Sequence, residues 1–263
     1  MTDEQVPGEG AAGPFGAPFR VRFDEAGPDG LVRTSSLLRY AQDVAWLHSD
    51  SLGFDRAWYR DRALTWLVRA AELTVDRPIR AGSTLLVRTE VVGFRRVWSR
   101  RHTEVVDGSN GHRVATVDID WVLLDGHGAP TRIPPEIDSA FGRSVAASGA
   151  GLTLRRVSLG DAGPEVQARQ FGVRPQELDP LDHVNNAVYA DWLDEAVIAA
   201  GGRDDVRALP RTVGLEYALA AGPDEQVTTQ TWRDGQAWAC RVNGANGEEF
   251  LRARLGRPAT ATS

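Results

Sequence analysis

The chain contains no lysine, a single cysteine and no long apolar run. All thirty cationic residues are arginine, a bias so uniform that we attribute it to a GC-rich genome rather than to a site. The lone Cys240 excludes an intrachain disulfide and favours a reducing compartment. No apolar stretch approaches the ~18 residues of a membrane span, and the acidic, Gly/Ala-rich N-terminus lacks the basic and apolar regions of a secretory signal. We therefore expect a cytoplasmic protein that does not cross a membrane.

The charge balance narrows the range of partners. The formal net charge is −6, whereas nucleic-acid binding generally requires a basic surface, so we expect no nucleic-acid partner. Hydrophobic residues make up 42% and charged residues 25% of the chain, as is usual for a soluble globular protein. The spacing of His102, His112 and His127 does not suggest a metal site.

The most informative segment is 179–192, which reads Asp-Pro-Leu-Asp-His-Val-Asn-Asn-Ala-Val-Tyr-Ala-Asp-Trp. It places a carboxylate, Asp179, four residues before His183, and two asparagines that favour a helix start follow. Apolar residues then recur on one side of a helical wheel, which predicts a buried helix over about 186–200. The free N–H groups at the start of such a helix suit a reaction in which negative charge develops on an oxygen.

The chain reads as one pattern written twice. Each copy has a strand, a helix and four consecutive strands without crossover helices, which excludes a parallel doubly wound sheet. We expect the first copy as a strand at 19–24, a helix at 35–51 and strands at about 63–76, 84–94, 98–107 and 113–124. We expect the second as a strand near 168–174, the 186–200 helix and strands at about 211–219, 225–233, 236–243 and 248–255. The predicted fold class is α+β with pseudo-twofold symmetry.

The composition also divides the chain. We expect disordered tails at 1–17 and 257–263, folded units at 18–135 and 166–256, and a Gly- and Ala-rich linker at 136–165.

The pattern Asp-x-x-x-His-Val-Asn-Asn-x-x-Tyr-x-x-Trp resembles the active-site turn of hot-dog-fold thioesterases, in which an antiparallel sheet wraps one central helix. Further segments resemble the acyl-acyl carrier protein thioesterases, namely Gln42-Asp43 with His48, 64–68, 121–125 with Arg132 and Pro134, and Leu215-Glu216-Tyr217. The resemblance covers roughly 18–255. It implies two tandem hot-dog units, a double hot-dog, in which the N-terminal unit shapes the acyl pocket and the C-terminal unit is catalytic.

The two copies differ where the chemistry is expected. If Tyr40 is matched to Tyr189, then Asp179 corresponds to Gly30 and His183 to Thr34. The first copy then has neither a carboxylate nor an imidazole at these positions, so the chain is equipped for one site.

The sequence departs from the family at three positions. In plant members the turn reads Asp-x-Asn-x-His, and a Glu-Cys pair follows on a later strand. Here Leu181 replaces the asparagine, and Ala220 and Ala221 replace the pair. Glu216 lies on the same strand, but at about 3.3 Å per residue it is about 13 Å away, so we do not expect it to substitute.

The remaining constellation resembles that of hydroxybenzoyl-CoA-type thioesterases. It implies that Asp179 acts as a general base on water or attacks the thioester carbonyl. Backbone N–H groups around His183 and Val184 would hold the oxyanion, and His183 would orient Asp179 or donate to the carbonyl. We include Asn185 in this predicted catalytic turn. No metal and no cofactor are implied.

Other residues are candidates for binding the substrate. Trp46 and Trp66 could line an acyl tunnel, although core packing alone would also explain them, and Asn186 borders the turn. Arg95 and Arg96 lie in a basic run over 94–101, which could dock an acidic carrier protein or the phosphates of a pantetheine arm. A solvated hairpin end would explain the same run.

The favoured function is hydrolysis of a fatty acyl thioester of acyl carrier protein or coenzyme A. Two alternatives stay open: a hot-dog dehydratase or hydratase, for which no second histidine is in place, and a non-catalytic protein that binds acyl thioesters. The acyl chain length stays open, and the chain would be a monomer or a homodimer.

Overall fold

The computed structural model describes residues 14–141 and 152–258. Residues 1–13 and 259–263 of the expected tails, and residues 142–151 of the expected linker, lie outside the described residues. The strands are β1 (Phe15–Arg20), β2 (Thr65–Val75), β3 (Thr84–Arg95), β4 (Trp98–Asp107), β5 (Arg113–Leu124), β6 (Gln167–Gly172), β7 (Arg211–Tyr217), β8 (Gln226–Asp234), β9 (Ala237–Gly244) and β10 (Glu249–Gly256). The helices are α1 (Thr34–Ser51), α2 (Arg56–Asp61), α3 (Pro135–Phe141), α4 (Val188–Ala199) and α5 (Arg203–Arg207), and single 3₁₀ turns form at Phe23–Glu25 and Pro175–Glu177.

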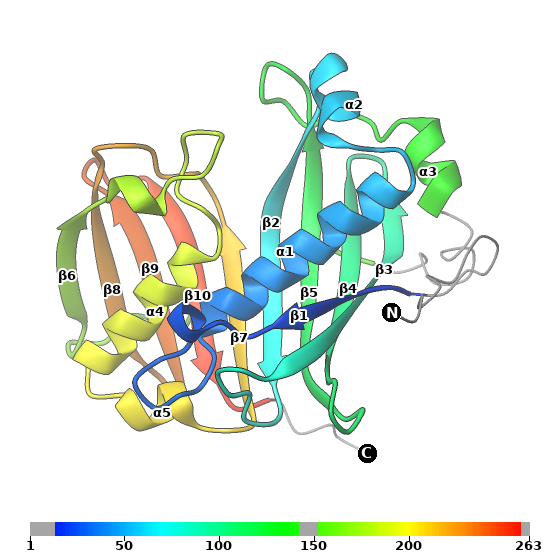
Figure 1. Cartoon of the computed structure of the whole chain (residues 1–263). Helices are drawn as coiled ribbons and strands as arrows, with labels where there is room; N and C mark the ends of the chain where they lie inside the picture. Colours follow the sequence, from blue (N-terminus) through cyan, green and yellow to red (C-terminus); the bar gives the residue numbers. More distant parts are fainter. Residues whose placement is uncertain (1–13, 142–151, 259–263) are drawn as a thin grey trace.

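The strands form one antiparallel sheet in the order β1-β3-β4-β5-β2-β7-β10-β9-β8-β6. The first five strands belong to the first half of the chain and the last five to the second, and β2 pairs with β7 where the halves meet. The sheet wraps around α1 in the first half and α4 in the second (Figure 1). This confirms the predicted double hot-dog, with the two units joined edge to edge.

Both long helices bury one apolar face against the sheet. Leu37 and Val44 of α1 are fully buried, as are Leu193 and Val197 of α4, and all four belong to one core cluster that extends across both halves. Burying each such side chain stabilises the fold by about 1.5–3 kcal/mol. The periodicity that predicted the helices is therefore also what fixes them on the sheet.

The first strand begins earlier than predicted. It pairs with β3 from Phe15, opposite Thr89, to Arg20, opposite Thr84, so residues 15–17 belong to the sheet rather than to a tail. The predicted strand at 19–24 is therefore displaced. Its second half forms a 3₁₀ turn, because the Glu25 carboxylate accepts a hydrogen bond from the Arg22 N–H at 2.7 Å.

The predicted linker is structured where the structure describes it. Residues 135–141 form α3, and residues 152–160, which we name the strap, cross the outer face of the sheet, away from the helices. The Arg155 N–H donates to Asp120 of β5 at 2.8 Å, and the Val157 N–H donates to Glu216 of β7 at 2.8 Å. The strap therefore joins the two halves on the outer face of the sheet, the face opposite the one that packs against α1 and α4.

Glu216 is a structural residue of this outer face. Its strand neighbours Leu215 and Tyr217 point into the core, so its own side chain points to the other side of the sheet. Burial opposes its ionisation, but hydrogen bonds from the Val157 N–H and from Arg156 outweigh that effect, and the pKa of Glu216 is lowered. Its placement agrees with the expectation that it does not replace the missing family carboxylate.

Candidate active site

Asp179 stands at the start of a tight loop. Leu178 and Val184 form an isolated antiparallel bridge, and the Asp179 N–H donates to the His183 carbonyl at 2.8 Å. The loop closes because Asp182 adopts φ of 60°, in the left-handed region that aspartate tolerates. One carboxylate oxygen of Asp179 accepts the Leu181 N–H at 2.8 Å, and the other has no partner among the described residues. Half-buried Asp179 therefore keeps a free oxygen for chemistry.

The residues after His183 fix the start of α4. The Val184 N–H donates to the Ala221 carbonyl at 2.8 Å, and the Asn185 N–H donates to the Glu177 carbonyl at 2.9 Å. The Asn185 side-chain oxygen accepts the Ala187 N–H at 3.0 Å. The Val184 N–H is therefore occupied, which corrects its predicted role as an oxyanion donor, and Asn185 orients the helix start.

His183 and Asn186 both offer free donors in the turn. Neither backbone N–H has a hydrogen-bond partner among the residues that the structure describes, and the same holds for both side chains. The Asn186 carbonyl accepts the Tyr217 hydroxyl at 2.8 Å, which fixes the peptide of Asn186. His183 is exposed and able to contact a substrate.

The first half contains a turn of the same shape. The Gly27 N–H donates to the Leu31 carbonyl at 2.8 Å, as Asp179 does to His183, and Ala26 bridges Val32. Gly30 supplies the positive φ, 75°, that Asp182 supplies in the second half. The turns are therefore equivalent in backbone, and Gly27 and Leu31 stand where Asp179 and His183 stand.

Glutamates confirm this correspondence. Glu25 accepts the Tyr40 hydroxyl at 2.5 Å, and Glu177 accepts the Trp192 indole N–H at 3.1 Å. Tyr40 is therefore equivalent to Trp192 and not to Tyr189, so the predicted matches to Gly30 and Thr34 were wrong by three residues. The main inference is unchanged, because the corrected positions also lack a carboxylate and an imidazole.

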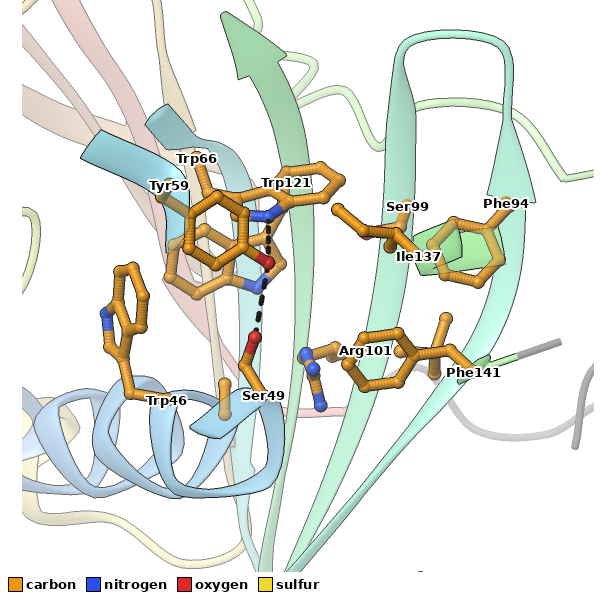
Figure 2. A pocket seen from close by; sticks show the side chains of 12 residues that line it. Trp46, Ser49, Tyr59, Trp66, Phe94, Ser99, Arg101, Trp121, Ile137 and Phe141 are labelled. Carbon is orange, nitrogen blue, oxygen red and sulfur yellow. Dashed lines mark hydrogen bonds between the residues drawn. The ribbon is translucent and has the colours of Figure 1, made fainter. Parts of the chain in front are cut away.

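A small apolar cavity of about 40 Å³ lies in the first half between α1 and the sheet, under α2 and α3. Trp46 and Trp66 both line it, as predicted for the acyl tunnel (Figure 2). The Trp66 indole donates to the Tyr59 hydroxyl at 3.1 Å, and that hydroxyl shares a hydrogen bond of 3.1 Å with Ser49. Since one water needs roughly 10–15 Å³ of such space, a fatty chain enters only if these aromatic side chains move.

The cavity and the Asp179 turn lie at the same end of the sheet. Trp66 is at the beginning of β2, and Ala221, which holds Val184, follows the end of β7. Because β2 and β7 are antiparallel neighbours, these two ends are adjacent. The first half thus presents its cavity beside the turn of the second half.

Arg101 was missed as a residue of the cavity. Its side chain is only 8% exposed, lies 3.1 Å from His48 Nδ1 and sits over the Phe141 ring (Figure 2). Burial lowers the pKa of Arg101 to about 10, and burial followed by the Arg101 charge lowers the pKa of His48 to about 4. His48 is therefore a neutral core residue at pH 7, and strand alternation, which turns Arg101 inward, was the signal for its position.

The basic run is only partly a surface. Arg100 binds the buried Asp120 through two hydrogen bonds of 2.6 and 2.8 Å, and Arg101 is inside. Arg95 is half-buried and donates to the Leu152 carbonyl at 3.3 Å, whereas Arg96 is exposed at the hairpin end. A docking role for Arg95 and Arg96 stays a prediction.

Other chemistries find little support in residues 14–141 and 152–258. No cluster of His, Cys, Asp and Glu in these ranges could hold a metal ion. Cys240 is fully buried, and burial raises the pKa of its thiol to about 11, so it is a poor nucleophile. No helix within the same ranges is both long enough and apolar enough to cross a membrane.

The fold and the turn define a double hot-dog protein with one thioesterase-like turn. Residues 14–141 match the acyl-ACP thioesterase N-terminal domain, and residues 161–247 match the acyl-ACP thioesterase C-terminal domain. The chain belongs to the acyl-ACP thioesterase family.

Curated relatives come from plants. The chain is 24% identical to a chloroplastic palmitoyl-acyl carrier protein thioesterase of Gossypium hirsutum, over 82% of this chain and 54% of the relative. It is 27% identical to a chloroplastic dodecanoyl-[acyl-carrier-protein] hydrolase of Cinnamomum camphora, over 70% of this chain and 52% of the relative. The chain thus spans about half the length of the curated relatives it matches.

Solved structures agree with the fold over nearly the whole chain. A putative oleoyl thioesterase from Lactobacillus plantarum has a TM-score of 0.80 at 17% identity and covers 94% of this chain and 98% of its own. A 12:0-ACP thioesterase from Umbellularia californica has a TM-score of 0.76 at 24% identity and covers 96% of this chain and 100% of its own.

Proposed function

We propose that this protein hydrolyses a fatty acyl thioester of acyl carrier protein, or of coenzyme A, to a free fatty acid and the carrier thiol. The observation that carries the proposal is the difference between the two equivalent turns. The turn before α4 contains Asp179 and His183, whereas the turn of the first half has Gly27 and Leu31 at the equivalent positions. Family membership supports a thioester substrate. The names of the plant relatives, which specify acyl-carrier-protein substrates, support the carrier.

Asp179 is the group that activates the attack. As a general base its free oxygen takes a proton from water, the water oxygen adds to the carbonyl carbon, and the carbon–sulfur bond then breaks. The proton passes to the leaving thiolate. As a nucleophile, the same oxygen adds to the carbonyl carbon and the carbon–sulfur bond breaks, which leaves a mixed anhydride and a thiolate. Water then cleaves the anhydride to the fatty acid and the Asp179 carboxyl group, whose proton passes to the thiolate. In either route the exposed His183 donates to the substrate carbonyl or orients the carboxylate.

The cavity of the first half receives the acyl chain. Trp46 and Trp66 bound it next to the turn, and the chain displaces the aromatic side chains that fill it in the free protein. The carrier approaches from the side of the exposed β3–β4 hairpin end. Arg95 and Arg96 contribute positive charge there, so R95E/R96E should raise the KM for acyl carrier protein substrates, and an unchanged KM would remove this part of the proposal.

A substrate panel with one matched pair of variants tests the reaction. Wild-type protein should release free thiol from acyl carrier protein or coenzyme A thioesters. Asp179→Asn keeps the shape of the turn but removes the base, so kcat should fall by at least ~10²-fold. Asp29→Asn, in the equivalent turn of the first half, should leave kcat unchanged.

Three results would contradict the proposal. A wild-type rate in Asp179→Asn would remove Asp179 from the mechanism. A hydrolytically silent wild type that still binds acyl thioesters would favour the non-catalytic alternative. Products altered at the β-carbon, with the thioester intact, would favour the dehydratase or hydratase alternative.

We also propose a cytoplasmic location and a monomeric or homodimeric state. The free thiol of Cys240 fits a reducing compartment. The pairing of β2 with β7 already supplies, within one chain, the contact between two hot-dog units. Fractionation and light scattering test the two statements separately.

A further inference from the structure

Contacts between α1 and α4 define the pseudo-twofold axis. Arg39 and Asp191 lie 3.5 Å apart, and they are equivalent residues of the two halves, so the axis passes between them. Away from the axis, Thr34 at the start of α1 donates to Asp194 of α4 at 3.3 Å. The pseudo-twofold symmetry places the equivalents of these two residues near each other as well, although no hydrogen bond joins them. The equivalent of Thr34 is Asn186, and that of Asp194 is Gln42.

The position of Gln42 on α1 agrees with this placement. Ser35, Arg39, Gln42 and Trp46 follow one another at helical spacing on one face of α1. Ser35 and Arg39 contact Asp191 of α4, and Trp46 lines the cavity. Gln42 therefore lies along α1 between the helix–helix contact and the cavity.

Gln42 and Asn186 both have hydrogen-bond donors without an acceptor among the described residues. Gln42 is half-buried, and its amide makes no hydrogen bond with the described residues. The N–H of Asn186 is free as well, while its carbonyl is held by Tyr217. Both groups are therefore unused donors, and the symmetry places them near each other, where they can receive one ligand oxygen.

We propose that Gln42 reaches across the interface and, together with the Asn186 N–H, donates to the thioester carbonyl oxygen. This inference rests on the proposed function. When water activated by Asp179 adds to the carbonyl carbon, the electron pair of the C=O bond moves to that oxygen, and the two donors stabilise its charge. The pair returns as the carbon–sulfur bond breaks, and the thiolate leaves with the proton from Asp179. Gln42 thus takes the role that the occupied Val184 N–H cannot perform.

The equivalent position in the other half supports the assignment. Asp194 offers a carboxyl group in place of the amide, next to a cavity of about 900 Å³ beside the Gly27 turn. That carboxyl group is already paired, because it accepts the Thr34 hydroxyl at 3.3 Å. The side of the Gly27 turn therefore lacks a base and has no unpaired amide at this position, whereas the Asp179 side has both.

Kinetics of Gln42→Ala test the role. Removing one oxyanion donor typically costs about 10²–10³-fold in kcat, and we expect such a loss with KM changed by less than about threefold and an unchanged Tm. Gln42→Glu should be at least as slow, because it introduces a negative charge. Asp194→Asn, at the equivalent position, should keep the wild-type kcat. A kcat within about threefold of wild type in Gln42→Ala, or a loss confined to KM or Tm, would overturn the proposal.

A crosslinking experiment tests the placement without relying on activity. A short bis-maleimide should join the Gln42→Cys/Asn186→Cys pair within one chain, as it should join Thr34→Cys/Asp194→Cys, whose side chains are in contact. It should not join Asp50→Cys/Asn186→Cys, because Asp50 is about 12 Å further along α1. If the wild type hydrolyses no thioester, the proposed function fails. If the 42/186 pair fails to crosslink while 34/194 does, the placement of Gln42 fails.

Discussion

The buried ion pair under the strap offers a direct test of what holds the outer face of the sheet. Asp120 is fully buried and accepts three hydrogen bonds, two from Arg100 at 2.6 and 2.8 Å and one from the Arg155 N–H at 2.8 Å. Asp120→Asn keeps the size of the side chain but removes its charge. Arg100, whose side chain is only 12% exposed, is then left without its counter-charge.

The expected cost follows from this burial. Removing one partner of a buried pair costs about 3–5 kcal/mol, because the other charge stays desolvated. Arg100 keeps a hydrogen bond of 2.9 Å to the Thr153 carbonyl, so we place the loss at the lower end, about 3 kcal/mol. For a chain of this size that corresponds to a fall in Tm of roughly 6–12 °C.

Urea unfolding of five proteins measures the effect: wild type, Asp120→Asn, Arg100→Met, the double variant and a control, Asp50→Asn. Asp50→Asn, on the exposed end of α1, should change the free energy of unfolding by less than about 0.5 kcal/mol. Arg100→Met combined with Asp120→Asn should recover part of the loss, because no uncompensated charge remains. The reasoning is refuted if Asp120→Asn costs less than about 1 kcal/mol, the range of an exposed pair, or if the two substitutions are additive.

Four further results are expected. The pKa of His48 is lowered from 6.5 to about 4, so between these pH values the folded state binds fewer protons than the unfolded state. As the pH falls through that window, urea unfolding should show the wild type losing stability relative to His48→Gln by up to about 1.4 kcal/mol per pH unit. Parallel pH profiles of the two proteins would contradict this. Burial raises the pKa of Asp194 from 3.8 to about 7, so the wild type should lose stability relative to Asp194→Asn as the pH rises from 4 to 7. If the stability difference between the two proteins stayed constant over this pH range, Asp194 would not be a buried neutral carboxyl group. Trp46→Ala and Trp66→Ala should shift the acyl panel towards longer chains, whereas an unchanged profile would remove both residues from the pocket. Glu216→Gln should lower the Tm through the strap but leave kcat within about twofold, and a large loss in kcat would return Glu216 to the list of catalytic candidates.

The elements were predictable because their periodicity is strong. Strand alternation and the apolar stripes of α1 and α4 reflect burial on one face, which the sequence displays directly. The start of β1 was not predictable in this way. Phe15-Gly-Ala-Pro carries few strand-forming residues, and only its pairing with β3 draws it into the sheet.

The correspondence between the halves could not be obtained from matching residue types. Tyr40 and Trp192 differ in shape and composition, yet each donates to the equivalent glutamate, and that equivalence appears only in three dimensions. Similarly, Val184 is a plausible oxyanion donor from its place before α4, and the hydrogen bond to Ala221 that occupies it comes from a distant segment. The prediction of Asp179 and His183 as site residues depends on local spacing, which the sequence contains in full, and it stays a prediction.

The pairing of β2 with β7 has a consequence for behaviour on dilution. Separate hot-dog subunits would meet in a bimolecular step, so the fraction assembled would depend on protein concentration. Here both strands belong to one chain, and their association is unimolecular. The Asp179 turn therefore keeps α1 beside it at any concentration, and turnover per chain should stay constant across serial dilution.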